Sequence, residues 1–135
     1  MHIITEQQIA EVLDPEIAFF AVQDVFASME SAAWNFPVVR ESLGHQNALY
    51  GFKSGFDPAS GALGLKAGGY WPNNASNGIA NHQSSIFLFD AESGQCSSLL
   101  AGNTITALRT AAAAAVSRDM ASCGESGGEG EGRRG

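Results

Sequence analysis

Four consecutive apolar residues, IFLF at positions 86–89, limit the possible folds more than any other part of the sequence. A run this short and continuous is typical of a central strand that is buried on both faces of its sheet. The turn residues DAESG follow at 90–94, and the β-prone segment QCSSLLAG follows them. We therefore predict a β-hairpin over residues 85–100.

Helices are predicted on either side of a region of short strands. Thr5 and Gln8 have the spacing of a capping box, and Asp14 before Pro15 is a second helix start signal, so a short helix and a longer one ending near Ser31 are expected. Segments 38–43, 47–56 and 62–71 have the composition of strands separated by turn residues. A last helix begins after Gly102, and its five alanines, 111–115, favour a tight contact with the sheet. The predicted class is α+β, with N-terminal helices, a mixed or antiparallel sheet containing a hairpin, and an alanine-rich helix.

Charge and composition exclude several classes of function. The net charge of −7 argues against binding to a nucleic-acid backbone, which depends on many lysines and arginines. No apolar run is long enough to span a membrane and the N-terminus is unlike a signal peptide, so we expect no membrane contact and a cytoplasmic location. Cys96 and Cys123 indicate neither a disulfide framework nor a metal site.

The basic residues are few and unusually placed. Only four precede residue 118, and three of them, Arg40, Lys66 and Arg109, have mainly apolar neighbours in sequence. Each one alone could be an ordinary surface residue whose head group reaches water. Arg109 has the stronger functional case, because the start of its helix offers free N–H groups and its guanidinium can bind two oxygens of one carboxylate. His82 lies before the apolar strand without a second ligand nearby and is interpreted as structural.

The stretch from Gly64 to Ala115 resembles the ornithine cyclodeaminase/μ-crystallin family. The resemblance rests on a strand lysine in LGLKAGG, a Pro-x-Asn loop, a turn ending in His82, the apolar-strand hairpin and a Thr-x-x-Arg-Thr-Ala-Ala helix. It implies an enzyme that uses NAD or NADP and acts on an α-amino or cyclic α-imino acid. Two reactions are implied as candidates: conversion of ornithine to proline and ammonia, and reduction of Δ1-pyrroline-2-carboxylate.

The resemblance also implies roles for individual residues. Arg40, Lys66 and Arg109 are expected to bind the substrate, with Lys66 as the catalytic residue at the reacting centre. Arg109 and Thr110 are expected to contact the cofactor, and Asn81 stands where the family often has a cofactor-contacting threonine. No metal is implied. Homodimer formation through this part of the chain is also expected from the family.

The final residues differ from the rest in composition. Residues 123–135 are rich in glycine, and we interpret them as a disordered tail after an incomplete substrate-binding and dimerisation domain, 1–122. Their GEGRRG has the form of a dinucleotide-binding fingerprint, but neither a strand nor a helix flanks it. We expect the family's Rossmann domain to be missing, the chain alone to be inactive, and a frameshift to be one origin of the tail. The alternative is a non-catalytic oligomerisation or carboxylate-binding module.

Overall fold

A mixed sheet of seven strands and three α-helices form the part of the chain that the computed structural model describes, residues 1–29 and 34–126. The α+β class predicted from the sequence is confirmed. No helix in these residues is long and apolar enough to cross a membrane. The elements, in chain order, are β1 (His2–Ile4), α1 (Glu6–Val12), α2 (Pro15–Met29), β2 (Trp34–Asn35), β3 (Val39–Ser42), β4 (Leu49–Asp57), β5 (Ala62–Tyr70), the 3-10 helix η1 (Asn74–Asn77), β6 (His82–Phe89), β7 (Cys96–Ala101) and α3 (Asn103–Ser126).

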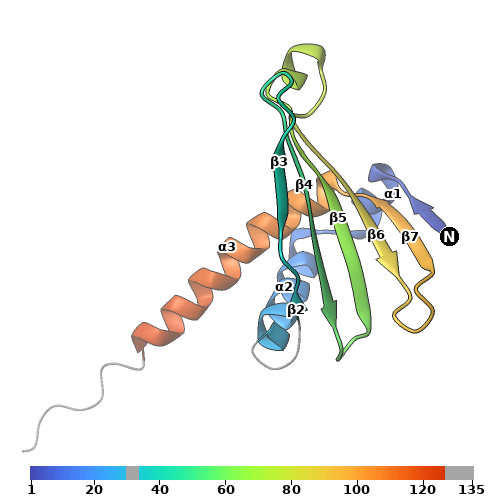
Figure 1. The fold of residues 1–135 in the computed structure, drawn as a ribbon. Coiled ribbons are helices and arrows are strands. Elements are labelled where there is room, and N and C mark those ends of the chain that lie inside the picture. The colour runs from blue at the N-terminus through green and yellow to red at the C-terminus, as the bar shows by residue number, and fades with distance from the viewer. Residues whose placement is uncertain (30–33, 127–135) are drawn as a thin grey trace, which may run out of the picture.

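The sheet has the strand order β1-β7-β6-β5-β4-β2, and β3 also pairs with β4 (Figure 1). Among the described strands only β1 and β7 pair in parallel, and this pairing places the N-terminal segment beside the strand that precedes α3. The sequence did not predict β1 or β2. They have three and two residues, which is too short for a hydrophobic period to be visible.

Aspartates organise the turns of both long hairpins. Asp90 accepts hydrogen bonds from the backbone N–H groups of Glu92 and Ser93, and Gly94 completes the turn with φ +73°. The hairpin predicted over 85–100 is therefore confirmed. Asp57 stabilises the turn between β4 and β5 in the same way, because its side chain accepts hydrogen bonds from Ala59 N and Ser60 Oγ.

The predicted helix starts at the N-terminus are also confirmed. Thr5 and Gln8 form a complete capping box at α1. At the start of α2, Asp14 Oδ1 accepts a hydrogen bond of 2.8 Å from Ile17 N. The helix α2 is described to Met29, and the end predicted near Ser31 lies outside the described residues.

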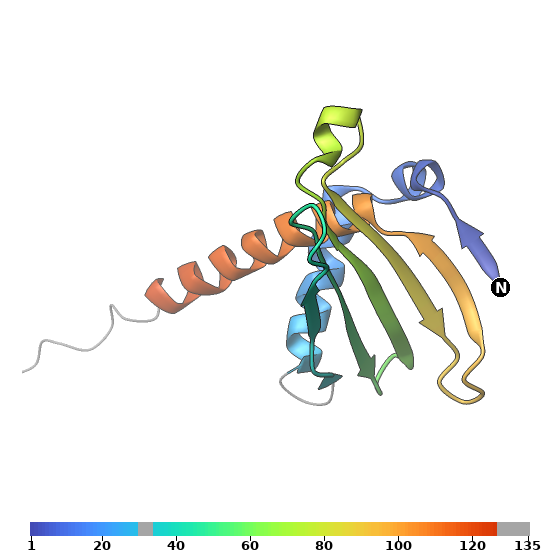
Figure 2. The same cartoon turned by 45° about the horizontal axis from the view of Figure 1, so that its top comes forward.

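Most of the small buried core lies on the helices. On α3, Ala112 and Val116 are 5% and 1% exposed, one turn apart, and α3 packs mainly against α2. The alanine run therefore permits close helix–helix packing, and the helix–sheet contact expected from it is wrong as the main contact. The second half of α3 extends beyond the sheet (Figures 1 and 2). It continues to Ser126, past the expected boundary at 122, and the rest of the predicted tail lies outside the described residues.

One face of the sheet carries no helix (Figure 1). Strand alternation and the pairing register give this open face a dense set of apolar side chains. The expectation that IFLF is buried on both faces is wrong for this chain, because Ile86 and Phe87 are only half-buried and Leu88 is 37% exposed. The residues that define the open face are Val39, Phe52, Phe56, Leu63, Leu65, Phe87 and Leu99.

Candidate functional site

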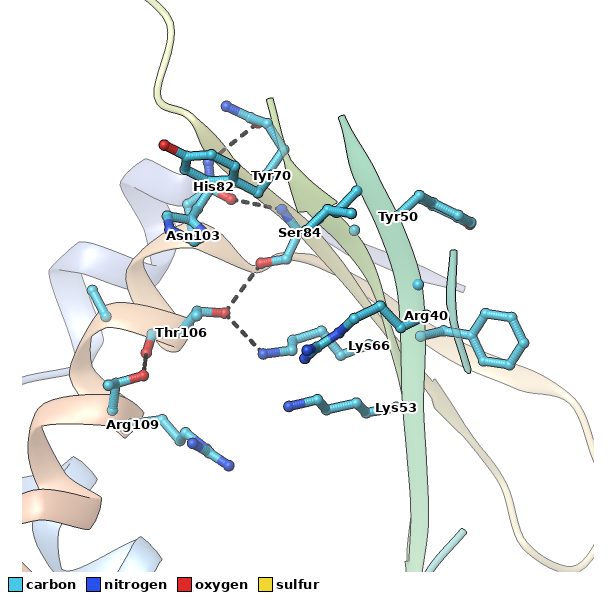
Figure 3. A pocket seen from close by; sticks show the side chains of 18 of the residues that line it. Arg40, Tyr50, Lys53, Lys66, Tyr70, His82, Ser84, Asn103, Thr106 and Arg109 are labelled. Carbon is cyan, nitrogen blue, oxygen red and sulfur yellow. Dashed lines mark hydrogen bonds between the residues drawn. The ribbon is translucent and has the colours of Figure 1, made fainter. Parts of the chain in front are cut away.

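A cavity of about 1060 Å³ lies between the sheet and the first half of α3 (Figure 3). Strands β3 to β6 supply one wall and α3 supplies the other. Figure 3 shows the side chains of Arg40, Lys53 and Lys66 extending from the sheet toward α3, while Arg109 extends from the helix toward the sheet. Four cations from four elements are therefore brought together in one cavity.

The sheet register explains why three of these cations share a face. Arg40 lies directly opposite Gly51, and Gly51 lies opposite Gly68. Two pairs further along, Lys53 lies directly opposite Lys66. Residues that face each other, or that differ by two along a strand, project to the same side. The sequence therefore directs these side chains toward the helix.

The four cations have no anionic partner in the described part of the chain. Among residues 1–29 and 34–126, no carboxylate forms an ion pair with Arg40, Lys53, Lys66 or Arg109. In a chain with a net charge of −7, acidic residues are plentiful elsewhere. A local cluster of positive charge without internal neutralisation is suited to binding an anionic ligand.

Lys66 is the most enclosed of the four and is held by hydroxyl groups. Its Nζ donates to Thr106 Oγ1 at 3.4 Å, and Thr106 Oγ1 lies 3.1 Å from Ser84 Oγ. Burial lowers the pKa of Lys66 below its ordinary value, and the charges of Arg109 and Lys53 lower it further. The ammonium group can therefore release a proton more readily than an ordinary lysine.

The N-terminus of α3 is already occupied by a carboxylate of the protein. Glu6 accepts hydrogen bonds from Asn103 N at 2.7 Å and Thr104 N at 3.1 Å. A hydrogen bond from the Thr104 side chain is the largest cause that lowers the pKa of Glu6, and the two backbone hydrogen bonds add to it. The sequence argument that these N–H groups await a ligand is therefore wrong. The candidate anion site consists of side-chain cations instead.

Glycines form part of the cavity wall because the strands approach closely there. Gly68 has φ +157°, and a Cβ at this position would lie 1.9 Å from the carbonyl oxygen of Gln83 and 2.7 Å from Ser84 Cα. A Cβ at Gly51 would similarly meet the carbonyl oxygen of Val39 at 2.1 Å. A side chain at either position would force the neighbouring strand to move.

The other predicted site residues divide into two groups. Thr110 lines the cavity, where its hydroxyl donates to the Thr106 carbonyl oxygen at 2.7 Å. Asn81 does not line the cavity, and its side-chain oxygen accepts from Ala75 N at 2.8 Å within the loop that precedes β6. His82 does line it, in ring contact with Tyr70 at 4.8 Å between centroids. The cofactor roles of Asn81, Arg109 and Thr110 stay predictions.

Lys53 is the one of the four cavity cations that sequence analysis missed. A usable signal was present: residues 53 and 66 are equally distant from the middle of the turn at 58–61. A hairpin centred on that turn pairs the two lysines, as the structure shows.

In the described part of the chain, no three His, Cys, Asp or Glu residues gather as metal ligands would.

An α+β domain whose sheet and helix surround four cations without an anionic partner among residues 1–29 and 34–126 has the chemistry needed to bind small carboxylates or similar anions. Residues 52–121, just over half of the chain, match the sequence model of the ornithine cyclodeaminase/mu-crystallin family. The chain belongs to that family. Arg40 lies outside the matched stretch, whereas Lys53, Lys66 and Arg109 lie within it.

Known relatives include an enzyme with a solved structure. The iminosuccinate reductase of Paracoccus denitrificans is 58% identical over 118 residues, which cover 87% of this chain and 37% of that protein. Its crystal structure in complex with NAD+ superposes with a TM-score of 0.81, covering 85% of this chain and 36% of that one. The ketimine reductase mu-crystallin of Rattus norvegicus is 35% identical over 66 residues, 49% of this chain and 21% of that protein.

The fold also extends to distant relatives. The Thermococcus litoralis Δ1-pyrroline-2-carboxylate reductase, in complex with NADH and L-proline, is 23% identical and superposes with a TM-score of 0.82 over 84% of this chain and 36% of that one. At this identity the likeness concerns the fold alone. The chain spans less than two-fifths of the length of the relatives it matches.

Proposed function

We propose that this chain provides the substrate-binding part of an NAD(P)-dependent enzyme that reduces an α-imino acid. The observation that carries the proposal is the cavity in which Arg40, Lys53, Lys66 and Arg109 have no anionic partner among the described residues. The Paracoccus relative adds iminosuccinate to the two candidate substrates expected earlier, Δ1-pyrroline-2-carboxylate and ornithine. The cyclodeamination of ornithine stays a candidate reaction beside imine reduction.

The proposed roles follow from charge and position. Arg40 and Arg109 approach the cavity from opposite walls and would hold the carboxylate that is bonded to the reacting carbon. Lys66 lines the same cavity with a lowered pKa and would protonate the nitrogen as the imine is reduced. NAD(P), when bound, supplies the hydride for that carbon.

The residues present fit a cofactor only at the edge of the site. Arg109 and Thr110 lie on the exposed surface of α3 where it borders the cavity, so both can contact a cofactor that approaches from this side. In residues 1–29 and 34–126 only β1 and β7 pair in parallel, and the helix–strand repeat of a dinucleotide-binding domain is not among these elements. In this part of the chain, the proposed cofactor contacts that border the cavity are therefore those of Arg109 and Thr110 on α3, and the role of Asn81 stays a prediction.

A chimera tests the proposed function. The 118 matching residues of the Paracoccus iminosuccinate reductase would be replaced by those of this chain, and oxidation of NADH would be followed with iminosuccinate generated from oxaloacetate and ammonia. We expect reduction of iminosuccinate, because the transplanted residues carry the four cations. A chimera that folds and binds NAD+ but has no activity on any of the three candidate substrates would contradict the proposal and favour a carboxylate-binding module.

We also propose that the chain forms a homodimer through the open sheet face. Phe52 there is 37% exposed and Val39 is 38% exposed, and an apolar surface of this extent is characteristic of a protein interface. Phe52→Asp is expected to weaken self-association at least about tenfold, because the carboxylate would lose its water in the interface. Analytical ultracentrifugation would measure this, with Ile79→Asp as the control at an exposed loop position away from this face. Equal association of both variants and the unmodified chain would contradict the proposal.

A further inference from the structure

We propose that Lys53 is a specificity-determining residue that binds a second carboxylate, so that the site selects dicarboxylic amino or imino acids. The inference rests on the proposed function, since it concerns the same cavity. It assigns to Lys53 a role that differs from those of the other three cations. Those three suffice to hold an α-carboxylate and a reacting nitrogen.

The position of Lys53 follows from strand pairing. Lys53 and Lys66 are directly opposite across β4 and β5, so their Cβ atoms are about 4.5–5.5 Å apart. Both side chains extend toward α3 (Figure 3). A ligand whose reacting nitrogen lies at Lys66 therefore has its next substituents within reach of the Lys53 ammonium group.

The pairing is unfavourable without a ligand. Like charges directly opposite on neighbouring strands repel each other. Lys53 and Lys66 are directly opposite, and the charge of Lys53 adds to burial and Arg109 in lowering the pKa of Lys66. No carboxylate among the described residues offsets this repulsion. An anionic group of the ligand, placed between the two lysines, would do so.

The sheet leaves room for such a group. On both sides of the Lys53–Lys66 pair, the facing residues are glycines: Gly51 opposite Gly68, and Gly55 opposite Gly64. Gly51 and Gly68 line the cavity without presenting a side chain to it, whereas Gly55 and Gly64 lie outside its lining. A monocarboxylic ligand held by Arg40 and Arg109 would leave Lys53 without a partner, whereas a side-chain carboxylate would reach it.

A binding experiment on the full 135-residue chain tests this inference. L-Aspartate and L-asparagine have nearly the same shape and differ by one carboxylate, so NMR titration with each ligand measures what that charge contributes. We expect aspartate to bind about tenfold more tightly, as one charge-assisted hydrogen bond would give. Lys53→Met should bring the ratio of the two affinities close to one while the affinity for asparagine changes little. Lys53→Arg should restore the preference for aspartate. Arg118→Met removes the same charge from an exposed position on α3 and should leave the ratio unchanged.

Each result of this experiment is decisive. Equal affinities for the two ligands in the unmodified chain would overturn the role of Lys53 and leave the proposed function standing. So would a Lys53→Met variant that keeps the tenfold preference or weakens both ligands equally. If neither ligand binds to the unmodified chain, the proposed function itself fails.

Discussion

Replacing Lys66 by methionine is expected to stabilise the fold and to destroy the proposed activity. Methionine has nearly the same length but no charge, so the repulsion from Lys53 and Arg109 disappears along with the cost of partial burial. The free energy of unfolding should increase by up to about 1 kcal/mol, the range for a facing pair of like charges. In the chimera, kcat/KM should fall at least about 100-fold, as for loss of a group that transfers a proton.

The pH dependence of the free energy of unfolding provides an independent test of the electrostatic role of Lys66. The pKa of Lys66 is lowered in the folded state from the ordinary value of 10.5. Between the lowered pKa and 10.5, the unfolded chain binds more protons than the folded chain. The free energy of unfolding therefore rises with pH across that window. Urea denaturation at a series of pH values should show this rise in the unmodified chain and lose it in Lys66→Met.

Arg118→Met is the matched control for Lys66. Arg118 lies exposed on α3, so its loss should leave both kcat/KM and the pH profile unchanged. Lower stability of Lys66→Met would show that the hydrogen bond from Lys66 to Thr106 outweighs the repulsion. That outcome would contradict the electrostatic account of the cavity.

The second large effect concerns the backbone. Gly68→Ala is expected to lower the free energy of unfolding by about 3 kcal/mol or more, because its Cβ would meet the backbone of β6 at 1.9 Å and 2.7 Å. Relief of this clash requires Ser84 to move, and Ser84 contacts Thr106, which in turn holds Lys66. Carboxylate affinity should therefore fall together with stability, as measured by urea denaturation and NMR titration.

Gly124→Ala makes the same chemical change where space is available. Apart from the adjacent backbone of its own helix, no described atom lies within 4 Å of a Cβ at Gly124, which is part of α3. In an exposed helix, this change stabilises by up to about 1 kcal/mol. A lower free energy of unfolding for Gly68→Ala and a higher one for Gly124→Ala would support the steric explanation. A Gly68→Ala variant as stable as the unmodified chain would refute it.

Local signals in the sequence were sufficient to predict most of the helices, strands and turns. The capping residues Thr5 and Asp14 and the turn residues around Asp90 each act within four positions, so their effects are visible in the sequence. β1 was missed because its pairing with β7 links residues almost a hundred positions apart. IFLF was assigned correctly to a strand, but its burial depends on what covers the sheet, which the hydrophobic pattern does not specify.

The site was only partly predictable from the sequence, because part of it depends on contacts between residues far apart in the chain. Arg40, Lys66 and Arg109 were selected by resemblance to a family, and the structure brings them into one cavity. Lys53 was missed, because its place follows from strand register. The anion site expected at the start of α3 was wrong, because the long-range hydrogen bonds of Glu6 satisfy those N–H groups.

The hydrogen bond from Asn103 N to Glu6 spans 97 residues and has a consequence for synthesis of the chain. At typical translation rates, about 5–20 s separate the appearance of its two partners. During that interval Ile3 and Ile4 have no strand to pair with, because β7 has not yet been made. The segment of β1 is therefore made well before its partner strand but is among the last to reach its final position, and it remains available to chaperones until the hairpin and the start of α3 have been made.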